Sequence, residues 1–151
     1  MHFRPPLASA GLSRLEASSV PPLAAPAATL EPKPGYTIEN CVNTLDVAKA
    51  QKTKVGYQYW FADIDFAEGN TLKLSVVGAG QATHAPHRHI EDEFFFVLEG
   101  QAEFFLDGER RVVGPNTSLY CPSGHEHGIR NAGDTELKYL VVKRYPPGKR
   151  P

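Results

Sequence analysis

Two histidines and a glutamate lie close together near the middle of the chain, at His87, His89 and Glu93. Alternate residues of an extended chain point to the same side, so the two imidazoles can reach one point together. Glu93 joins them from the next extended segment if the chain bends between Ile90 and Asp92. Imidazole nitrogens and a carboxylate oxygen that converge in this way form a transition-metal site. The stretch 83–100 therefore predicts a metal centre.

A second motif, CPSGHEHGIRN over residues 121–131, supplies His127 as a fourth candidate ligand. The two stretches together resemble the two signature motifs of the cupin superfamily, in its small conserved-barrel "cupin 2" type. The first motif is His-x-His, three residues, Glu, six residues, Gly, and the second is Pro-x-Gly, two residues, His, three residues, Asn. The matching residues are His87, His89, Glu93 and Gly100 for the first motif, and Pro122, Gly124, His127 and Asn131 for the second.

Two glycines that open these motifs in the family are displaced here. Gly80 lies seven residues before His87 instead of six, and Asn116 stands where the second motif begins, with Gly114 two residues earlier. Neither displacement touches a ligand. The resemblance covers roughly residues 70–143, and it is specific for a fold and a metal site but not for one reaction.

The resemblance implies one divalent transition metal per chain, held by His87, His89, Glu93 and His127. Four ligands leave two open positions on an octahedral ion, where a small substrate can chelate through two oxygens or dioxygen can bind beside it. Fe2+, Mn2+, Ni2+ and Zn2+ all accept imidazole and carboxylate ligands, so the ligand types do not choose among them. Asn131 is expected to make a structural hydrogen bond and not to bind the metal.

The catalytic residues are unknown from the sequence, and the candidates are His84, Tyr120 and Tyr139. His84 is either an acid/base group at the cavity mouth or a surface histidine near Pro86. Strand parity alone suggests that the two tyrosines face the cavity. A tyrosine there could act as a base or hold a substrate carboxylate. Some cupin lyases carry a tyrosine two residues after the glutamate, and Phe95 in that place counts against their reaction.

Four further residues near the motifs have alternative roles. Glu91 and Asp92 lie in the bend and offer a different carboxylate ligand if the bend differs, although the family spacing favours Glu93. His125 is expected at the mouth or the surface. Cys121 either lines the pocket or is a buried structural thiol, which is the commoner case.

Short strands with turns between them fill the chain from Val55 onward. Alternating or apolar runs predict strands over 55–64, 71–77, 83–89, 93–98, 102–106, 110–113, 118–121, 126–130 and 136–145. Asp107-Gly108 predicts a two-residue type I′ hairpin, and Thr44 is a possible N-cap for a short helix over 46–54. This pattern predicts an all-β sandwich or barrel, which the resemblance narrows to a single cupin jelly-roll barrel.

The strand 93–98 is apolar on both faces. Glu93, Phe95 and Val97 share one face and should line the metal cavity, whereas Phe94, Phe96 and Leu98 face the other way. A strand of this kind needs cover on both sides. The cover is expected from the N-terminal arm or from a second subunit, and the resemblance also points to a homodimer.

Composition sets the class of the molecule and its organisation. At 151 residues the chain fits one folded domain, predicted at 36–151 with the metal motifs within 83–131, after an extended arm at 1–35 that holds seven prolines and seven alanines. The net charge of −1, without a basic cluster, argues against nucleic acid or an anionic membrane as a partner. No apolar run is long enough to cross a membrane, and prolines interrupt the apolar N-terminal stretch, so a cytoplasmic location is expected.

Three functions are compatible with these features. The first is a metal-dependent enzyme, a dioxygenase or an isomerase or lyase, that acts on a small substrate with chelating oxygens. The second is a non-catalytic module whose cavity binds a small molecule. The third is a metal-free sugar epimerase of the RmlC-like barrel type, which the complete ligand set makes the weakest of the three.

Overall fold

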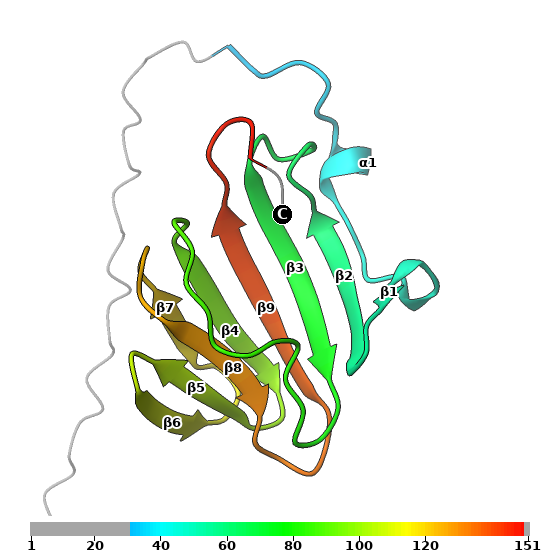
Figure 1. Ribbon diagram of the computed structural model, residues 1–151. Helices are drawn as coiled ribbons and strands as arrows, with labels where there is room; N and C mark the ends of the chain where they lie inside the picture. The colour runs from blue at the N-terminus through cyan, green and yellow to red at the C-terminus, as the bar shows by residue number, and fades with distance from the viewer. Residues whose placement is uncertain (1–30, 150–151) are drawn as a thin grey trace, which may run out of the picture. The chain divides into compact units, whose positions relative to one another are not determined.

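The computed structural model describes residues 31–149 (Figure 1). The chain divides into two units, of which the first ends at Gly35 and the second begins at Tyr36. The Pro/Ala-rich arm predicted at 1–35 lies almost entirely outside the described residues. The fold described is therefore that of the second unit.

Two antiparallel sheets form this unit and face one another (Figure 1). The larger sheet has the strand order β1-β2-β3-β9-β4-β7, with bounds Gln51–Lys52, Gly56–Ala62, Asn70–Val77, Leu137–Arg144, Glu93–Glu99 and Ser118–Cys121. The smaller has the order β6-β5-β8, with bounds Glu109–Val113, Ala102–Leu106 and His127–Asn131. These sheets make the all-β cupin-like barrel that the sequence predicts.

The core lies between the two sheets and follows from alternation along the strands. In β4, Glu93, Phe95 and Val97 are buried, as predicted, and the residues between them are exposed. Facing side chains complete the interior: Val77, Ala102, Phe104, Cys121, Ile129, Leu137, Tyr139 and Val141. The hairpin between β5 and β6 turns at Asp107 and Gly108, whose φ values of 46° and 93° fit the predicted type I′ turn.

The outer face of the large sheet is covered only in part. The Tyr59 hydroxyl donates to Asn43 Oδ1 and contacts the Thr44 carbonyl, so residues 43 and 44 lie against β2. Farther along the same sheet, Phe94 remains 46% exposed and Phe96 37% exposed. Such a patch is compatible with a second subunit, and the homodimer stays a prediction.

Helical structure in residues 31–149 is limited to α1, Ile38–Cys41, and the 3-10 turn η1, Val47–Lys49. The predicted helix over 46–54 was wrong. Asp46, not Thr44, caps η1 through the Ala48 amide, and Gln51 then pairs with Gln58 as strand β1. Within the described residues no helix is both long and apolar enough to cross a bilayer.

The strand predicted over 83–89 was also wrong. This segment forms a single isolated bridge, between His87 and His127. Pro86 explains why the ladder does not extend toward the N-terminus, because proline has no N–H to donate. The two histidines of the first motif therefore lie on an irregular segment beside β8.

Replacing Gly100 by alanine should destabilise the fold more than the same change at Gly108. Both glycines have positive φ, 84° and 93°, which costs an alanine about 1–2 kcal/mol. A Cβ on Gly100 would also lie 2.5 Å from the Glu136 carbonyl oxygen, whereas a Cβ on Gly108 meets open space. We expect the Gly100 variant to lose about 2 kcal/mol more free energy of unfolding in urea. Equal losses would contradict this explanation.

Candidate metal centre

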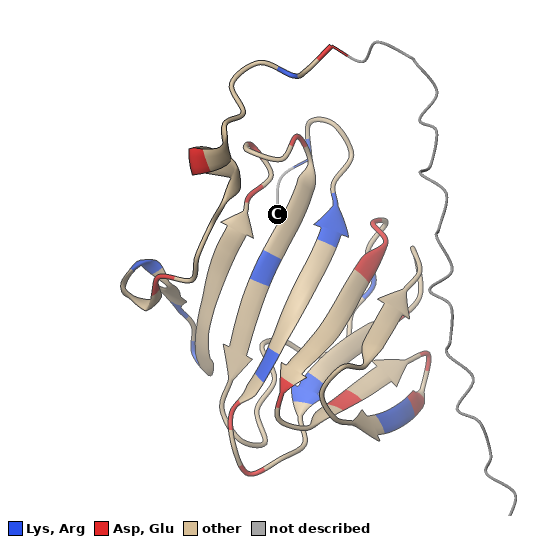
Figure 2. Cartoon of the chain, turned by 180° about the vertical axis from the view of Figure 1, so that it is seen from behind, with Lys and Arg blue, Asp and Glu red and all other residues tan. Residues whose placement is uncertain are grey.

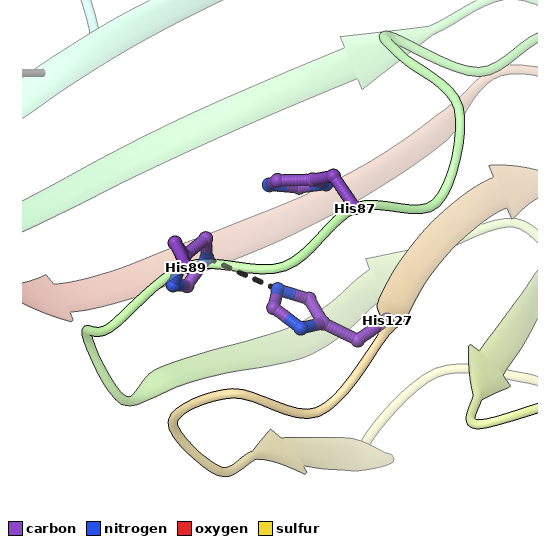
Figure 3. Close-up of side chains that lie close together, drawn as sticks. All are labelled: His87, His89 and His127. Atoms are coloured by element: carbon purple, nitrogen blue, oxygen red, sulfur yellow. Dashed lines mark hydrogen bonds between the residues drawn. The ribbon is translucent and has the colours of Figure 1, made fainter.

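Three histidines from two segments meet between the sheets (Figure 3). His87 and His89 come from the irregular segment before β4, and His127 is the first residue of β8. Mutual backbone hydrogen bonds of 3.0 Å between His87 and His127 join the two segments. The predicted site residues thus come together although their local structure differs from the prediction.

The Glu93 carboxylate points into the same cluster. Its Oε2 atom lies 3.3 Å from His89 Nε2 and 3.1 Å from His127 Nε2. The two Nε2 atoms are themselves 3.1 Å apart, along the dashed line in Figure 3. Three electron-rich atoms from three side chains therefore converge on one point.

Backbone carbonyls fix which nitrogen of each ring carries the proton. His89 Nδ1 donates to the Glu91 carbonyl at 2.8 Å, and His127 Nδ1 donates to the His125 carbonyl at 2.9 Å. A neutral imidazole that donates from Nδ1 presents a lone pair at Nε2. Both Nε2 lone pairs then face each other and an acceptor oxygen, an arrangement that a cation between them would stabilise.

His87 completes the cluster. One ligand atom from each of the three histidines lies within 4.8 Å of the others. The buried His87 Nδ1 has no hydrogen-bond partner among residues 31–149. An orphaned imidazole nitrogen beside two converging lone pairs fits a divalent transition metal, which imidazole and carboxylate ligands hold well.

Lys143 supplies a positive charge beside the cluster and was not among the predicted site residues. Its Nζ lies 2.9 Å from His89 Nε2 and 3.7 Å from Glu93 Oε1. Lys143 pairs directly with Glu93 across β9 and β4. The signal was present in the sequence, because Lys143 continues the inward alternation of Leu137, Tyr139 and Val141.

Glu91 and Asp92, the alternative carboxylates, have other partners. Glu91 is 4% exposed and its Oε1 lies 2.6 Å from Lys149 Nζ. Its backbone carbonyl orients His89, as described above. Asp92 accepts a hydrogen bond from the Ser123 amide at 2.9 Å. Glu91 therefore supports a ligand from behind the cluster, whereas the exposed Asp92 holds the turn at Ser123.

Two buried groups near Glu93 stay protonated. Burial, with a smaller contribution from the Glu93 charge, raises the pKa of the Cys121 thiol to about 12. In the metal-free protein Cys121 is therefore a neutral thiol. Burial also raises the pKa of Tyr139, which is 3% exposed and packs against the Phe95 ring. Its phenol can donate a hydrogen bond but is a poor base.

The remaining candidates lie farther out. The exposed His84 packs its ring edge-on to His87, with centroids 4.3 Å apart, so it stands beside the ligands. His125 is exposed and lies 2.5 Å from an Asp107 carboxylate oxygen. Tyr120 is 46% exposed and stacks on Phe94 on the outer face of the large sheet, so the structure does not bring it to the cluster.

The metal-free protein should lose stability as the pH falls from about 6.5 to about 4. Burial, together with the nearby histidines, lowers the pKa of His87 from 6.5 to about 4. Below pH 6.5 the unfolded chain binds this proton and the folded chain does not, which favours unfolding. Urea unfolding with a chelator present should show a shallower pH dependence for His87→Asn than for the wild type. Identical pH profiles would contradict this origin.

Comparison with known proteins yields one family. Residues 73–143 match the Cupin domain family. The Cupin 2 conserved barrel domain protein from Salinispora arenicola has a similar fold, with a TM-score of 0.58 and 23% identity over 69% of this chain and 87% of that one.

Two curated relatives share part of the chain. Mannose-1-phosphate guanylyltransferase from Escherichia coli is 28% identical over 89 residues, which are 58% of this chain and 19% of that protein. The dimethylsulfoniopropionate lyase DddQ from Ruegeria pomeroyi is 42% identical over 59 residues, which are 38% of this chain and 29% of the lyase. The matched region thus spans less than a third of either relative.

Proposed function

Since the chain belongs to the cupin superfamily, we propose that its cluster binds one divalent transition metal and acts on a small organic substrate. The ligands are His87, His89, Glu93 and His127. One observation carries the proposal: two Nε2 lone pairs and a carboxylate oxygen converge within 3.3 Å while both Nδ1 protons are held by backbone carbonyls. Such a set is preorganised for a cation and does not suit metal-free acid/base work, which counts against the epimerase alternative.

The protein's own groups hold the ligands in place and keep bulk water out. The carbonyls of Glu91 and His125 orient two imidazoles, and the bridge between His87 and His127 fixes the spacing of their segments. Phe95 and Ile129 are 3% and 4% exposed and pack in the interior near the cluster. A divalent ion would supply Lewis-acid stabilisation of charge on substrate oxygens and, if redox-active, activation of dioxygen.

The substrate class follows from the ligand number. A metal with four protein ligands accepts a molecule that offers two adjacent oxygens, such as an enediol, a hydroxy acid or a diphenol. His84, in contact with the His87 ring, is the proposed acid/base group at the site. Fe2+, Mn2+, Ni2+ and Zn2+ remain equivalent for this donor set.

Cobalt substitution tests the proposal. Protein loaded with Co2+ should show visible absorption bands that shift with catechol, which chelates through two oxygens, and not with phenol at the same concentration. Metal analysis after dialysis controls for removal of the ion by catechol. Equal responses to both compounds, or none to either, would contradict chelation at this site.

Turnover separates an enzyme from a binding module. The native metal directs the assay: oxygen uptake with diphenols for iron, and isomerase or lyase substrates for manganese, nickel or zinc. A metal-loaded protein that binds chelating ligands without converting any of them would favour the non-catalytic small-molecule binder.

A further inference from the structure

Two lysines lie on the interior face of the large sheet, where charged side chains are uncommon. Lys73 on β3 pairs with Val141, and Lys143 on β9 pairs with Glu93 and Thr71. Lys73 and Lys143 are therefore diagonal neighbours on one face, roughly 7–8 Å apart at the backbone. Blue segments mark basic residues within these two long strands in Figure 2.

Lys143 has a partner in this structure that a bound metal would remove. Its ammonium donates to His89 Nε2 at 2.9 Å. That lone pair cannot serve a metal ion and an ammonium group together. Once His89 is a ligand, Lys143 keeps the Glu93 oxygen at 3.7 Å and the Tyr145 ring, whose centroid lies 5.4 Å from Nζ. The donor that His89 accepted then becomes available.

Lys73 has no anionic partner at all within residues 31–149. Its Nζ lies 5.0 Å from the centroid of the Trp60 ring, and the described residues give it no hydrogen bond and no ion pair. Burial lowers the pKa of this amine, although the Glu93 charge raises it and the Lys143 charge lowers it further. An anionic ligand would stabilise the charged form and satisfy its donors.

The charges near the cluster do not balance. Lys73 and Lys143 share one nearby carboxylate, Glu93, because Glu91 is already paired with Lys149 at 2.6 Å. A divalent ion adds two more positive charges to this partly buried region. Unpaired charge in the interior is costly, so a negatively charged ligand offsets it.

We propose that the ligand is a small organic acid with an anionic group besides the oxygens that chelate the metal. Lys73, over the Trp60 ring, binds that second group, and Lys143 contributes the neighbouring charge. Lys73 is thus a specificity-determining residue that selects acids over neutral chelators. This assignment rests on the proposed function for the chelating oxygens, but its lysine part is testable separately.

A pair of hydroxy acids isolates the second anionic group. Malate and lactate share the same chelating head, and malate alone carries a distal carboxylate. Binding is measured by calorimetry on the metal-loaded protein, with the fluorescence of Trp60, the single tryptophan, as a local reporter. Malate should bind at least about tenfold more tightly than lactate, and Lys73→Met should abolish this preference.

Two further variants serve as controls. Lys138→Met removes a charge from the same strand as Lys143, but Lys138 pairs with Glu99 and alternates with the inward residues, so the malate preference should persist. Lys73→Arg retains the charge and should keep most of the preference. Comparison of the two acids on the wild type tests the inference even if a variant fails to fold.

The outcomes separate this inference from the proposed function, because metal content is measured independently. Equal binding of both acids, a preference that survives Lys73→Met, or no binding of either acid by metal-loaded protein would overturn the inference and leave the metal centre standing. A lysine-dependent preference for malate in a protein that takes up no metal would support the anion site while the metal proposal fails.

Discussion

Replacing Glu93 by glutamine should weaken metal binding by about 100-fold or more. Loss of a residue that only hydrogen-bonds to a ligand typically costs about 10- to 100-fold, and Glu93 is itself a proposed ligand. Glu93 is the one carboxylate in the proposed ligand set, and its Oε2 lies within 3.3 Å of two imidazole nitrogens. Glutamine keeps the shape but removes the charge and puts N–H donors beside the ligands. Competition with a chelator of known affinity measures the change, and circular dichroism establishes that the variant is folded.

Glu99→Gln is the matched control. Glu99 ends the same strand, is exposed, and pairs with Lys138 at 2.8 Å. Its substitution should leave metal affinity within twofold of the wild type, because it lies outside the ligand set. A folded Glu93→Gln protein that keeps wild-type affinity would remove Glu93 from the site.

Asn131→Ala should lower the free energy of unfolding by about 3–5 kcal/mol, through the loss of three interior hydrogen bonds. Asn131 is fully buried, and its Nδ2 donates to the carbonyls of Val77 and Thr135 at 2.9 and 2.7 Å. Its Oδ1 accepts from the Gly133 amide at 2.9 Å. This one side chain joins β3, β8 and the turn before β9. The thermal midpoint should fall by about 10 °C or more.

Asn70→Ala provides the comparison. Asn70 is exposed and donates one hydrogen bond, to the Ala67 carbonyl at 3.1 Å. Water can replace that partner, so the loss should stay below about 1 kcal/mol. If both variants unfold at the same urea concentration, Asn131 does not have the structural role that its contacts indicate.

Much of the fold follows from alternation and turn residues. The β3 strand and the Asp107-Gly108 turn are local signals that agree with the tertiary structure, although Thr71 and Ser75 of β3 are buried as well as Leu74 and Val76. The side of Glu93 was predicted correctly from strand parity, since burial alternates from Glu93 to Leu98.

Two segments could not be predicted from local pattern. Residues 51 and 52 continue a helix-like sequence, yet they pair with β2, and this pairing outweighs a weak helical preference. The sequence of segment 83–89 is typical of an extended strand. Because of Pro86 and the short β8, however, the segment forms only the His87–His127 bridge. The histidines still converge, because that bridge fixes His87 against His127.

The charges around the site were the largest omission. Lys73 and Lys143 lie at inward positions of strands that were predicted correctly. The alternation along each strand could therefore have shown that they share a face with other inward residues. The sequence does not tell which strands are neighbours. The β3-β9-β4 order places Lys143 beside Glu93 and Lys73 on the strand beyond it. Long-range pairing of this kind depends on the whole barrel and cannot be predicted from the sequence of a single strand.

Metal content of the untagged wild-type protein, purified without chelator or added metal and measured by elemental analysis, tests the central claim most directly. A metal centre predicts about one equivalent of iron, manganese, nickel or zinc per chain, in line with the single cluster found among residues 31–149. A protein that is empty and also refuses added Fe2+, Mn2+, Ni2+ and Zn2+ would contradict it. The histidines would then be an inherited scaffold, and a metal-free binding module would become the better explanation.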